Sequence, residues 1–315
     1  MTDRSPAPTV AAAARAPLPS GVRILPAAEH RSRAADHRAA VQLRTEAFLA
    51  RRRTGVSHPV EDFLFTYYSL KPGQLARWHP GAGVVLEGAG DSERPGWKFY
   101  TVVDDGTAAG GAVVDVPRFC AERGTTIGYI RRLLESTAAR PAQLGCFGLH
   151  EWAMVYRSRL HGQRHEQVPL RLGAEGTDEV VESLRIQCTH FDAFRFYTPS
   201  AAPLNRLQPT RETQVDLEQP GCLHANMDLY KWAGKLMPAL PSDLLLRCFD
   251  LARSIRELDM RASPYDLREW GYEPVRIEEP AGRAAYARAQ KEFAEQAQQL
   301  RGEILSALEA LESLR

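Results

Sequence analysis

The fold is decided by residues 281–314, AGRAAYARAQKEFAEQAQQLRGEILSALEALESL. Apolar side chains recur there at intervals of three and four residues, which is the period of one face of an α-helix. They are Phe293, Ala297, Leu300, Ile304, Leu308 and Leu311. The stretch therefore predicts a long amphipathic helix, and we expect it to pack on its own domain rather than on a second copy of the chain.

The preceding segments continue the helical pattern. Residues 242–258 begin with Ser242, a good capping residue, and carry a single apolar stripe made of Leu245, Phe249, Ala252, Ile255 and Leu258. We expect further helices at about residues 29–53, 58–70, 74–78, 117–138, 145–159, 177–186 and 223–236. Residues 188–197 are expected to form a strand or an irregular turn.

One region departs from the helical period. Residues 84–86, 97–103 and 112–116 are rich in β-branched and aromatic side chains and are separated by Gly, Asp and Pro, a pattern typical of short strands. The sequence thus predicts a mostly α fold, with a single helical domain over residues 23–315 and a small β insertion at residues 83–116. The Ala- and Pro-rich start predicts a disordered tail over residues 1–22.

The composition is that of a globular chain, with 315 residues, 44% of them hydrophobic, and a formal net charge of +1. No apolar run reaches the roughly 18 residues of a membrane span, and there is no signal segment, so we expect no membrane association and a cytoplasmic location. A protein that grips duplex DNA through its phosphates has a basic surface. The balanced charge therefore keeps a nucleoside, a damaged base and single-stranded nucleic acid open as partners.

The acid–base side chains gather in four aromatic-rich segments, residues 58–68, 146–156, 188–197 and 222–230. Each segment places a histidine within four residues of a carboxylate, among large apolar residues. Such groups are costly to bury unless they are paired. Four segments of this kind in one chain predict a shared polar pocket, and hence an enzyme.

A metal-free site is the first interpretation. The segments offer His150 beside Glu151, and His190 close to Asp192, as general acids and bases, because burial among aromatic rings would raise the pKa of a carboxyl group or hold a histidine neutral. The expected binding residues are aromatic rings that could stack on a nucleobase and polar side chains that could read its edge. The rings are Trp152, Tyr156, Phe191, Phe194 and Tyr197, and the polar side chains are Asn205, Gln208 and Asn226. Arg211 lies with Asn205 and Gln208 in a long connector, residues 199–220, that we expect to form a lid or pocket wall.

A metal site is the second interpretation. The pairs His58/Asp62 and His224/Asp228 are each four residues apart, which places both side chains on one helix face. With His150, Glu151 and His190 they could hold iron or another divalent metal. The Glu-x-x-His pattern of ferritin-like sites is absent, and the HExxH motif is absent because position 154 is Met.

Several long segments resemble one family. They are HPVEDFLFTYYS from residue 58, QLARWHPG from 74, GCFGLHEWAMVYR from 145, HFDAFRFYTP from 190, LQPTRE from 207, EQPGCLHANMDLYKWA from 218 and LDMRASPYDL from 258. Over roughly residues 56–300 the chain resembles a family of actinobacterial proteins commonly named 3-methyladenine DNA glycosylase. In helix–hairpin–helix glycosylases a Leu-Pro-Gly-x-Gly hairpin precedes the catalytic Asp by about twenty residues. The matching positions here are 237–241 and Asp259, with Ala239 and Pro241 in place of the two glycines.

Together these observations favour an N-glycosidase-type hydrolase that acts on a purine base in damaged nucleic acid or in a nucleoside, without a cofactor. Asp192, Glu151 or Asp259 would stabilise the sugar cation or activate water, and His150 or His190 would protonate the leaving base. One alternative is a metal-dependent enzyme of the non-haem iron type that acts on a small molecule. Another alternative is a non-catalytic binding protein.

Overall fold

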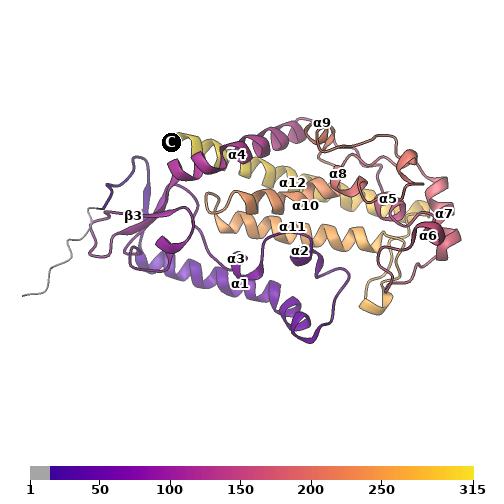
Figure 1. Cartoon of the computed structure of the whole chain (residues 1–315), viewed down its shortest axis with the longest axis horizontal. Helices are drawn as coiled ribbons and strands as arrows, with labels where there is room; N and C mark the ends of the chain where they lie inside the picture. Colours follow the sequence, from indigo (N-terminus) through magenta and orange to yellow (C-terminus); the bar gives the residue numbers. More distant parts are fainter. Residues whose placement is uncertain (1–14) are drawn as a thin grey trace, which may run out of the picture.

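The structure is a computed structural model that describes residues 15–315. It is elongated, with a small sheet at one end and a region of short helices and loops at the other (Figure 1). The long helices are α1 (Ala27–Thr54), α4 (Val116–Ala138), α7 (Gly173–Ser183), α10 (Leu223–Lys235), α11 (Ser242–Arg261) and α12 (Pro280–Ser313). The short helices are α2 (Phe63–Thr66), α3 (Pro72–Leu75), α5 (Leu149–Ala153), α6 (Ser158–His161), α8 (Phe191–Phe194) and α9 (Gln214–Leu217). The mostly α prediction is therefore confirmed.

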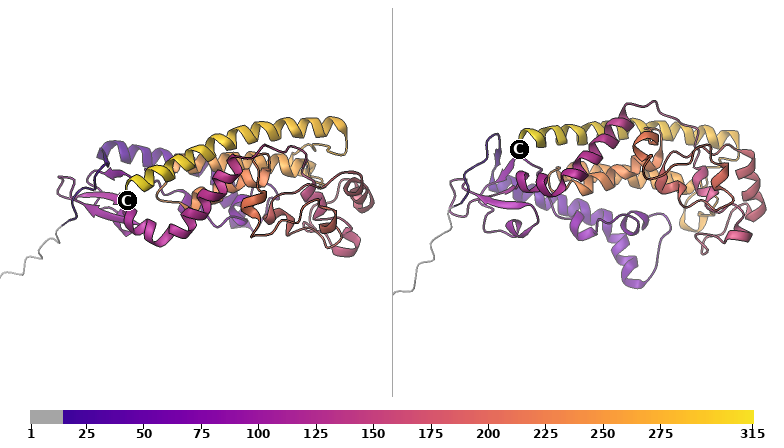
Figure 2. Two further views of the ribbon diagram at one scale, coloured as in Figure 1. Left: turned by 90° about the horizontal axis from the view of Figure 1, so that it is seen from above. Right: turned by 45° about the horizontal axis from the view of Figure 1, so that its top comes forward.

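Helix α12 is the long amphipathic helix expected from residues 281–314. It runs along the molecule beside α10, α11 and α4 (Figure 2). Its apolar face is buried, with Ala297, Ile304, Leu308 and Leu311 at most 2% exposed. The helix therefore packs on its own domain, because the residues that set its period are covered by neighbouring helices of the same chain.

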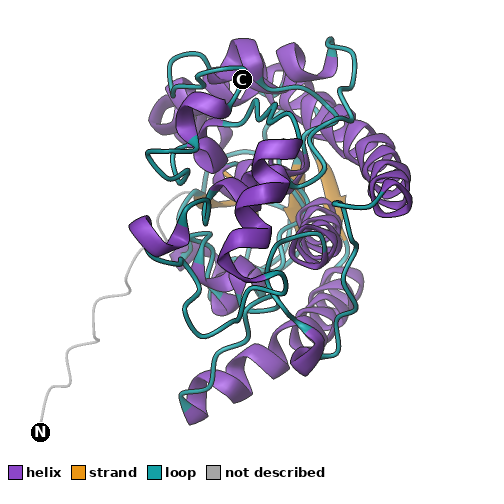
Figure 3. Cartoon of the chain, turned by 90° about the vertical axis from the view of Figure 1, so that its right-hand side faces the viewer, coloured by secondary structure: helices purple, strands orange, loops and turns teal. Residues whose placement is uncertain are grey.

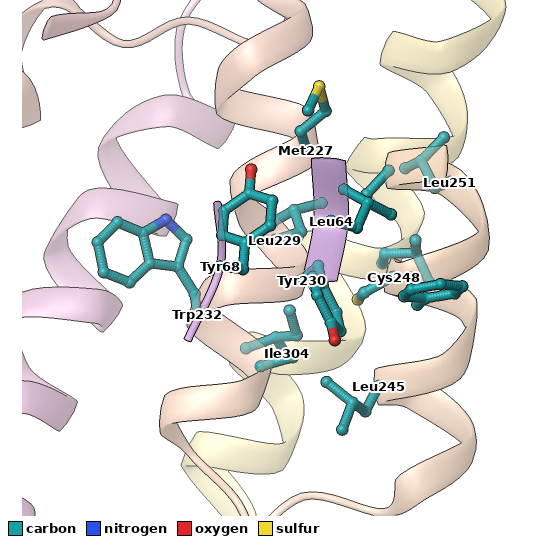
Figure 4. Packing of buried hydrophobic residues seen from close by; sticks show 14 of the residues in the cluster. Leu64, Tyr68, Met227, Leu229, Tyr230, Trp232, Leu245, Cys248, Leu251 and Ile304 are labelled. Atoms are coloured by element: carbon teal, nitrogen blue, oxygen red, sulfur yellow. The ribbon is translucent and has the colours of Figure 1, made fainter. Parts of the chain in front are cut away.

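The core lies where α10, α11 and α12 meet the segment that carries α2. Tyr230 of α10, Cys248 of α11 and Ile304 of α12 are each at most 1% exposed. Leu64 and Tyr68 enter this core from the α2 segment (Figure 4). Viewed from the end of the molecule opposite the sheet, helices and loops lie in front and the strands lie behind them (Figure 3). The rigid bundle thus supplies a fixed base for the loops at its far end.

The sheet lies at the end of the bundle where α12 finishes (Figure 1). Its strands are β1 (Arg23–Leu25), β2 (Val84–Leu86), β3 (Tyr100–Val103) and β4 (Gly111–Val114), in the order β1-β2-β4-β3. The predicted insertion at residues 83–116 contains β2, β3 and β4, which pair antiparallel. Strand β1 pairs parallel to β2 and was not predicted, because Arg23-Ile24-Leu25 lacks the consecutive β-branched residues that marked β2.

The predicted tail, residues 1–22, falls largely outside the described residues, which begin at Arg15. Residues 15 and 16 contact the sheet. The backbone of Ala16 accepts a hydrogen bond from Asp104, and Arg15 donates to the carbonyl oxygens of Thr107 and Ala108. The disordered tail stays a prediction for residues 1–14.

Two predicted helices are shorter than expected, and the backbone explains why. The segment 145–159 contains Phe147 and Arg157 with φ of 48° and 53°, and Gly148 with φ of 73°. A left-handed residue cannot continue a right-handed helix, so only α5 and α6 form there. In the segment 58–70, the Asp62 side chain accepts the His58 backbone N–H and leaves only α2 as regular helix.

Among residues 15–315, no helix combines the length and the apolar character that a membrane crossing requires.

Candidate functional site

Three of the four His-bearing segments converge at the end of the bundle opposite the sheet. His150 on α5 and His224 on α10 face each other edge-on, with ring centroids 4.4 Å apart. Asp259, near the end of α11, lies 3.0 Å from His150 Nε2. One ligand atom from each of these three residues lies within 4.8 Å of the others. We call them the His150 group.

A second group adjoins the first. The ring of His190, the residue before α8, lies 5.4 Å from that of His224. His190 Nε2 is 3.3 Å from Glu218 Oε1 and 3.4 Å from Asp228 Oδ2. These three residues, the His190 group, are at most 2% exposed, and their ligand atoms also lie within 4.8 Å of one another. His224, a member of the first group, is therefore also a neighbour of the second group.

Helix α10 supplies one residue to each group. The sequence pairs His224 with Asp228 on one helix face, but the structure divides the pair, because His224 faces Asp259 and Asp228 faces His190. The shared helix explains how the two groups come together. One turn of α10 spans the distance between them.

Neighbouring side chains hold the carboxylates of the His190 group. The Tyr68 hydroxyl donates to Asp228 Oδ1 at 3.0 Å, and the Lys231 ammonium bonds Asp228 Oδ2. The Gln214 amide donates to Glu218. Such outer contacts fix the direction in which a carboxylate presents its lone pairs.

Arg256 links the His150 group to Glu151. The guanidinium lies 2.9 Å from Glu151 Oε1 and 3.7 Å from Asp259 Oδ2, and it covers the Phe63 ring at 4.1 Å. Glu151 and Arg256 are 4% and 3% exposed. Glu151 is therefore a buried ion-pair partner of Arg256 rather than a neighbour of the His150 ring.

Burial and charge act against each other in the His150 group. Burial disfavours the charged imidazole, but the Asp259 carboxylate outweighs it and raises the pKa of His150 well above its usual value. Burial likewise opposes the Asp259 anion, yet the charge of His150 lowers the pKa of Asp259 to about 2. Burial and repulsion from His150 hold the pKa of His224 well below its usual value. In the absence of a ligand, these directions describe an imidazolium–carboxylate pair beside a neutral imidazole.

The His190 group is polarised in the same way. Burial acts to raise the pKa of Asp228, but Lys231 and His190 outweigh it and lower that pKa well below the usual range. Burial raises the pKa of Glu218. His190 is buried, but Asp228 and Glu218 raise its pKa. Asp228 is thus the anion of this group.

A small cavity of about 60 Å³ reaches His224. Its walls include Glu151, His165, Asp192 and Phe196. A single water needs about 10–15 Å³ of such volume, so the cavity accepts a few water-sized molecules. Sites for drug-sized ligands span about 300–1,000 Å³, so this space is too small for a purine.

The histidine and the aspartate of the first His-bearing segment, His58 and Asp62, lie apart from the cluster. Asp62 bonds the Arg51 guanidinium at 2.6 Å, and His58 Nδ1 accepts the backbone N–H groups of Val60 and Glu61. Both residues serve the local turn, and neither belongs to either metal-ligand group. Other residues of this segment reach the site, because Tyr68 bonds Asp228, and Phe63 and Tyr67 line the cavity at His224.

Most of the expected binding residues have structural contacts. Trp152 is fully buried and donates its indole N–H to the Ala262 carbonyl, while the Tyr156 hydroxyl donates to Glu182. Tyr197 is buried, and its ring packs 5.0 Å from that of Phe194. These placements leave Trp152, Tyr156 and Tyr197 unavailable to sandwich a base, because the three rings are buried in the interior.

The polar residues of the connector act mainly on the backbone. The Asn205 side chain accepts the Cys188 N–H and donates to the Cys188 carbonyl, two residues before His190. Asn226 donates to the Pro220 carbonyl and accepts from buried Arg301. Gln208 donates to the carbonyl oxygens of Ala202 and Asn205. Asn205 and Asn226 therefore position the loops that bring His190 and Glu218 to the site.

Three expected residues face a separate groove. Asp192 is half-buried and pairs with Arg195 at 3.0 Å and Lys231 at 3.3 Å. Phe191 and Arg211 line the same groove as Asp192. Asp192 also borders the small cavity at His224, so it separates the two spaces.

Sequence reasoning missed Glu218, Arg256 and Lys231. Glu218 is near the end of the connector that was expected to wall the pocket, but no histidine lies within four residues of it. Arg256 precedes Asp259 by three residues on α11, and Lys231 follows Asp228 by three on α10. This helical spacing was the signal that could have found the two cations.

Comparisons of this chain with protein-family models, with curated proteins and with solved structures find no match. The function must therefore be argued from the site itself.

Proposed function

We propose that this chain is a metal-dependent enzyme whose centre is formed by the His150 group and the His190 group. The donor set supports this proposal. His150, His224 and Asp259 supply two imidazoles and one carboxylate, the composition that non-haem Fe(II) enzymes use. The His190 group adds one imidazole and two carboxylates.

The spacing of the ligand atoms also fits a metal. Atoms bound at about 2.1 Å on adjacent corners of an octahedron lie about 3.0 Å apart. The separations are 3.0 Å for His150 and Asp259, and 3.3 and 3.4 Å for His190 with Glu218 and Asp228. A cation can therefore be accommodated by small adjustments of these side chains.

The observation that carries the proposal is His190. Its ring is 1% exposed, and neither of its nitrogens has a hydrogen bond of good geometry. Buried polar groups nearly always have a partner, and an exception calls for an ion, a water or a function. Two carboxylate oxygens lie near Nε2 but are poorly aligned for a proton, whereas a metal ion held among these three atoms would give Nε2 a partner.

The surrounding residues would orient the ligands. Tyr68, Lys231 and Gln214 fix the carboxylates of the His190 group, and Asn205 holds the backbone that leads to His190. When bound, a divalent metal of the iron type supplies Lewis acidity or redox chemistry. The cavity at His224 would admit a small co-substrate, and Glu151 and His165 in its wall could exchange protons there.

Metal binding by designed variants tests this function. Chelator-treated protein is titrated with Fe(II), Mn(II) or Zn(II), with thermal unfolding as the readout. We expect the midpoint to rise for the wild type, because a ligand that binds only the folded state stabilises it. The rise should vanish in His190→Gln/Asp259→Asn. His58→Gln is the matched control and should keep it. A wild type that none of these metals stabilises would reject the proposal.

A metal-free N-glycosidase is the second candidate. One observation favours it, since His150 and Asp259, two of its expected acid–base residues, form a buried pair. The test is release of 3-methyladenine from alkylated DNA in the presence of excess chelator. Release that depends on Asp259 would support this candidate. If neither metal binding nor base release is observed, the non-catalytic binding role becomes the better account.

A further inference from the structure

A second, larger opening lies beside the His190 group. It is a surface groove of about 580 Å³ between α4, the connector and α10. This volume lies within the range of small-ligand sites, unlike the small cavity at His224. The groove borders the site directly, because two of its lining residues contact the His190 group. Gln214 donates to Glu218, and Lys231 bonds Asp228.

The charge of the groove is positive. Arg132, Arg211, Lys231 and Lys235 line it against one carboxylate, Asp192. That carboxylate is already paired with Lys231 and Arg195. Within residues 15–315, Arg132, Arg211 and Lys235 are exposed and take part in none of the ion pairs. A concave surface with unpaired cations attracts and concentrates anions.

The groove also has an aromatic wall. Tyr129, Phe191 and Trp232 line it, and the Tyr129 and Trp232 rings meet edge-on at 5.8 Å. Trp232 projects from α10 on the opposite side from Leu251 (Figure 4). Its indole N–H is buried without an acceptor. Flat rings with nearby cations favour planar ligands, since both stacking and cation–π contacts are available.

We infer that this groove binds an aromatic anion, a planar ring that carries a phosphate, sulfonate or carboxylate group. The rings contact the planar part, and Arg132, Arg211 and Lys235 contact the anionic group. Lys231 and Gln214 then bring the ligand next to the His190 group. This inference deepens the proposed function by naming its substrate class, and it rests on that function only in treating the bound anion as a substrate. Binding of the anion does not depend on a metal, because the groove contains no member of the two metal-ligand groups.

The test uses the full chain as purified and the fluorescent aromatic sulfonate 8-anilinonaphthalene-1-sulfonate. We expect one molecule to bind per chain, and the uncharged analogue N-phenyl-1-naphthylamine to bind at least about tenfold more weakly. The variant Arg211→Ala/Lys235→Ala removes two exposed cations and should weaken sulfonate binding by about tenfold or more. Arg38→Ala/Arg52→Ala removes two exposed cations of α1 and should bind as the wild type does.

Competition identifies the anionic group. Displacement by adenosine monophosphate but not by adenosine indicates a phosphate ligand, and displacement by 4-hydroxybenzoate indicates a carboxylate ligand. Equal binding of the charged and uncharged probes would overturn the inference, as would full affinity in Arg211→Ala/Lys235→Ala. If the wild type binds no metal but still binds the probe, the proposed function is rejected and the assignment of the groove is retained.

Discussion

The Asp259 carboxylate lies 3.0 Å from His150 Nε2, although 109 residues separate them in the chain. Both residues are at most 2% exposed. This contact joins the short helix α5 to the end of α11, so the loop region is attached to the rigid bundle at the centre of the site. It also makes the two residues dependent on each other, because either one alone would be a buried charge or a buried unpaired ring.

Asp259→Asn should therefore be strongly destabilising in the metal-free protein. We expect a loss of about 3–5 kcal/mol in the free energy of unfolding, since the variant leaves His150 without its charged partner. Asp250→Asn is the control on the same helix. Its partner, Arg44, is half-buried and the pair lies near the surface, so the loss should be about 1 kcal/mol or less. Urea unfolding measures both, and equal losses would show that Asp259 is not a buried ion-pair partner.

Arg256→Met should lower the free energy of unfolding more than the double substitution Glu151→Met/Arg256→Met does. The single change leaves Glu151 buried beside an apolar side chain, at a cost of about 3–5 kcal/mol. In Glu151→Met/Arg256→Met both charges are gone, so we expect part of that stability to return. The comparison is a double-mutant cycle of unfolding free energies. Losses that simply add would mean that the 2.9 Å contact contributes nothing.

Asn205→Ala should weaken metal binding without removing a ligand. Its side chain bonds both the N–H and the carbonyl of Cys188, and the loss of such buried bonds costs about 1–3 kcal/mol. The segment that carries His190 would then be less well held, so metal affinity should fall by about tenfold or more, as for other outer contacts of metal sites. Gln208→Ala, on the exposed side of the same connector, should leave affinity unchanged. Isothermal titration calorimetry with the metal compares the two variants. Similar metal affinities would show that Asn205 does not position His190.

The buried ring of His79 should make the free energy of unfolding fall at acidic pH. His79 Nδ1 lies 3.0 Å from the Tyr100 hydroxyl, and burial, with nearby Arg94, His37 and Arg77, lowers the pKa of His79 from 6.5 to about 3. Below pH 6.5 the unfolded chain binds a proton that the folded chain does not, so stability is lost as the pH falls towards 3. The slope is up to about 1.4 kcal/mol per pH unit.

His79→Gln tests this dependence, because it removes the titrating ring. Unfolding free energies measured between pH 6 and pH 4 should fall less steeply in the variant than in the wild type. His30 and His37, whose pKa values burial also lowers, contribute the same background to both proteins. Parallel slopes would show that His79 takes up its proton in the folded state.

Helical periodicity was enough to predict the bundle. The apolar positions of α11 and α12 follow one face of a helix, and burial of that face decides the packing. The short pieces α5, α6 and α8 could not be predicted, because their boundaries depend on left-handed residues such as Arg157 and on tertiary hydrogen bonds. Strand β1 was missed because it has one β-branched residue, Ile24, and its pairing with β2 is a tertiary contact.

The site was predictable only in part. The density of His and carboxylate residues predicted a shared pocket that contains His150, His190, His224 and Asp228, and all four lie in the two metal-ligand groups. The pairing within the cluster was not predictable, because residues close in the chain, such as His190 and Asp192, face different partners. Glu218 reaches the site through the path of a loop, which no local pattern in the sequence reveals.

The metal content of the purified protein tests the central proposal most directly. Protein expressed in medium that contains iron, manganese and zinc is measured by inductively coupled plasma mass spectrometry, beside Asp228→Asn/Asp259→Asn. Our account predicts at least about one transition-metal ion per wild-type chain, held through gel filtration, and a small fraction of that in the variant. A wild type that carries no metal under these conditions, or a variant that carries as much as the wild type, would contradict it.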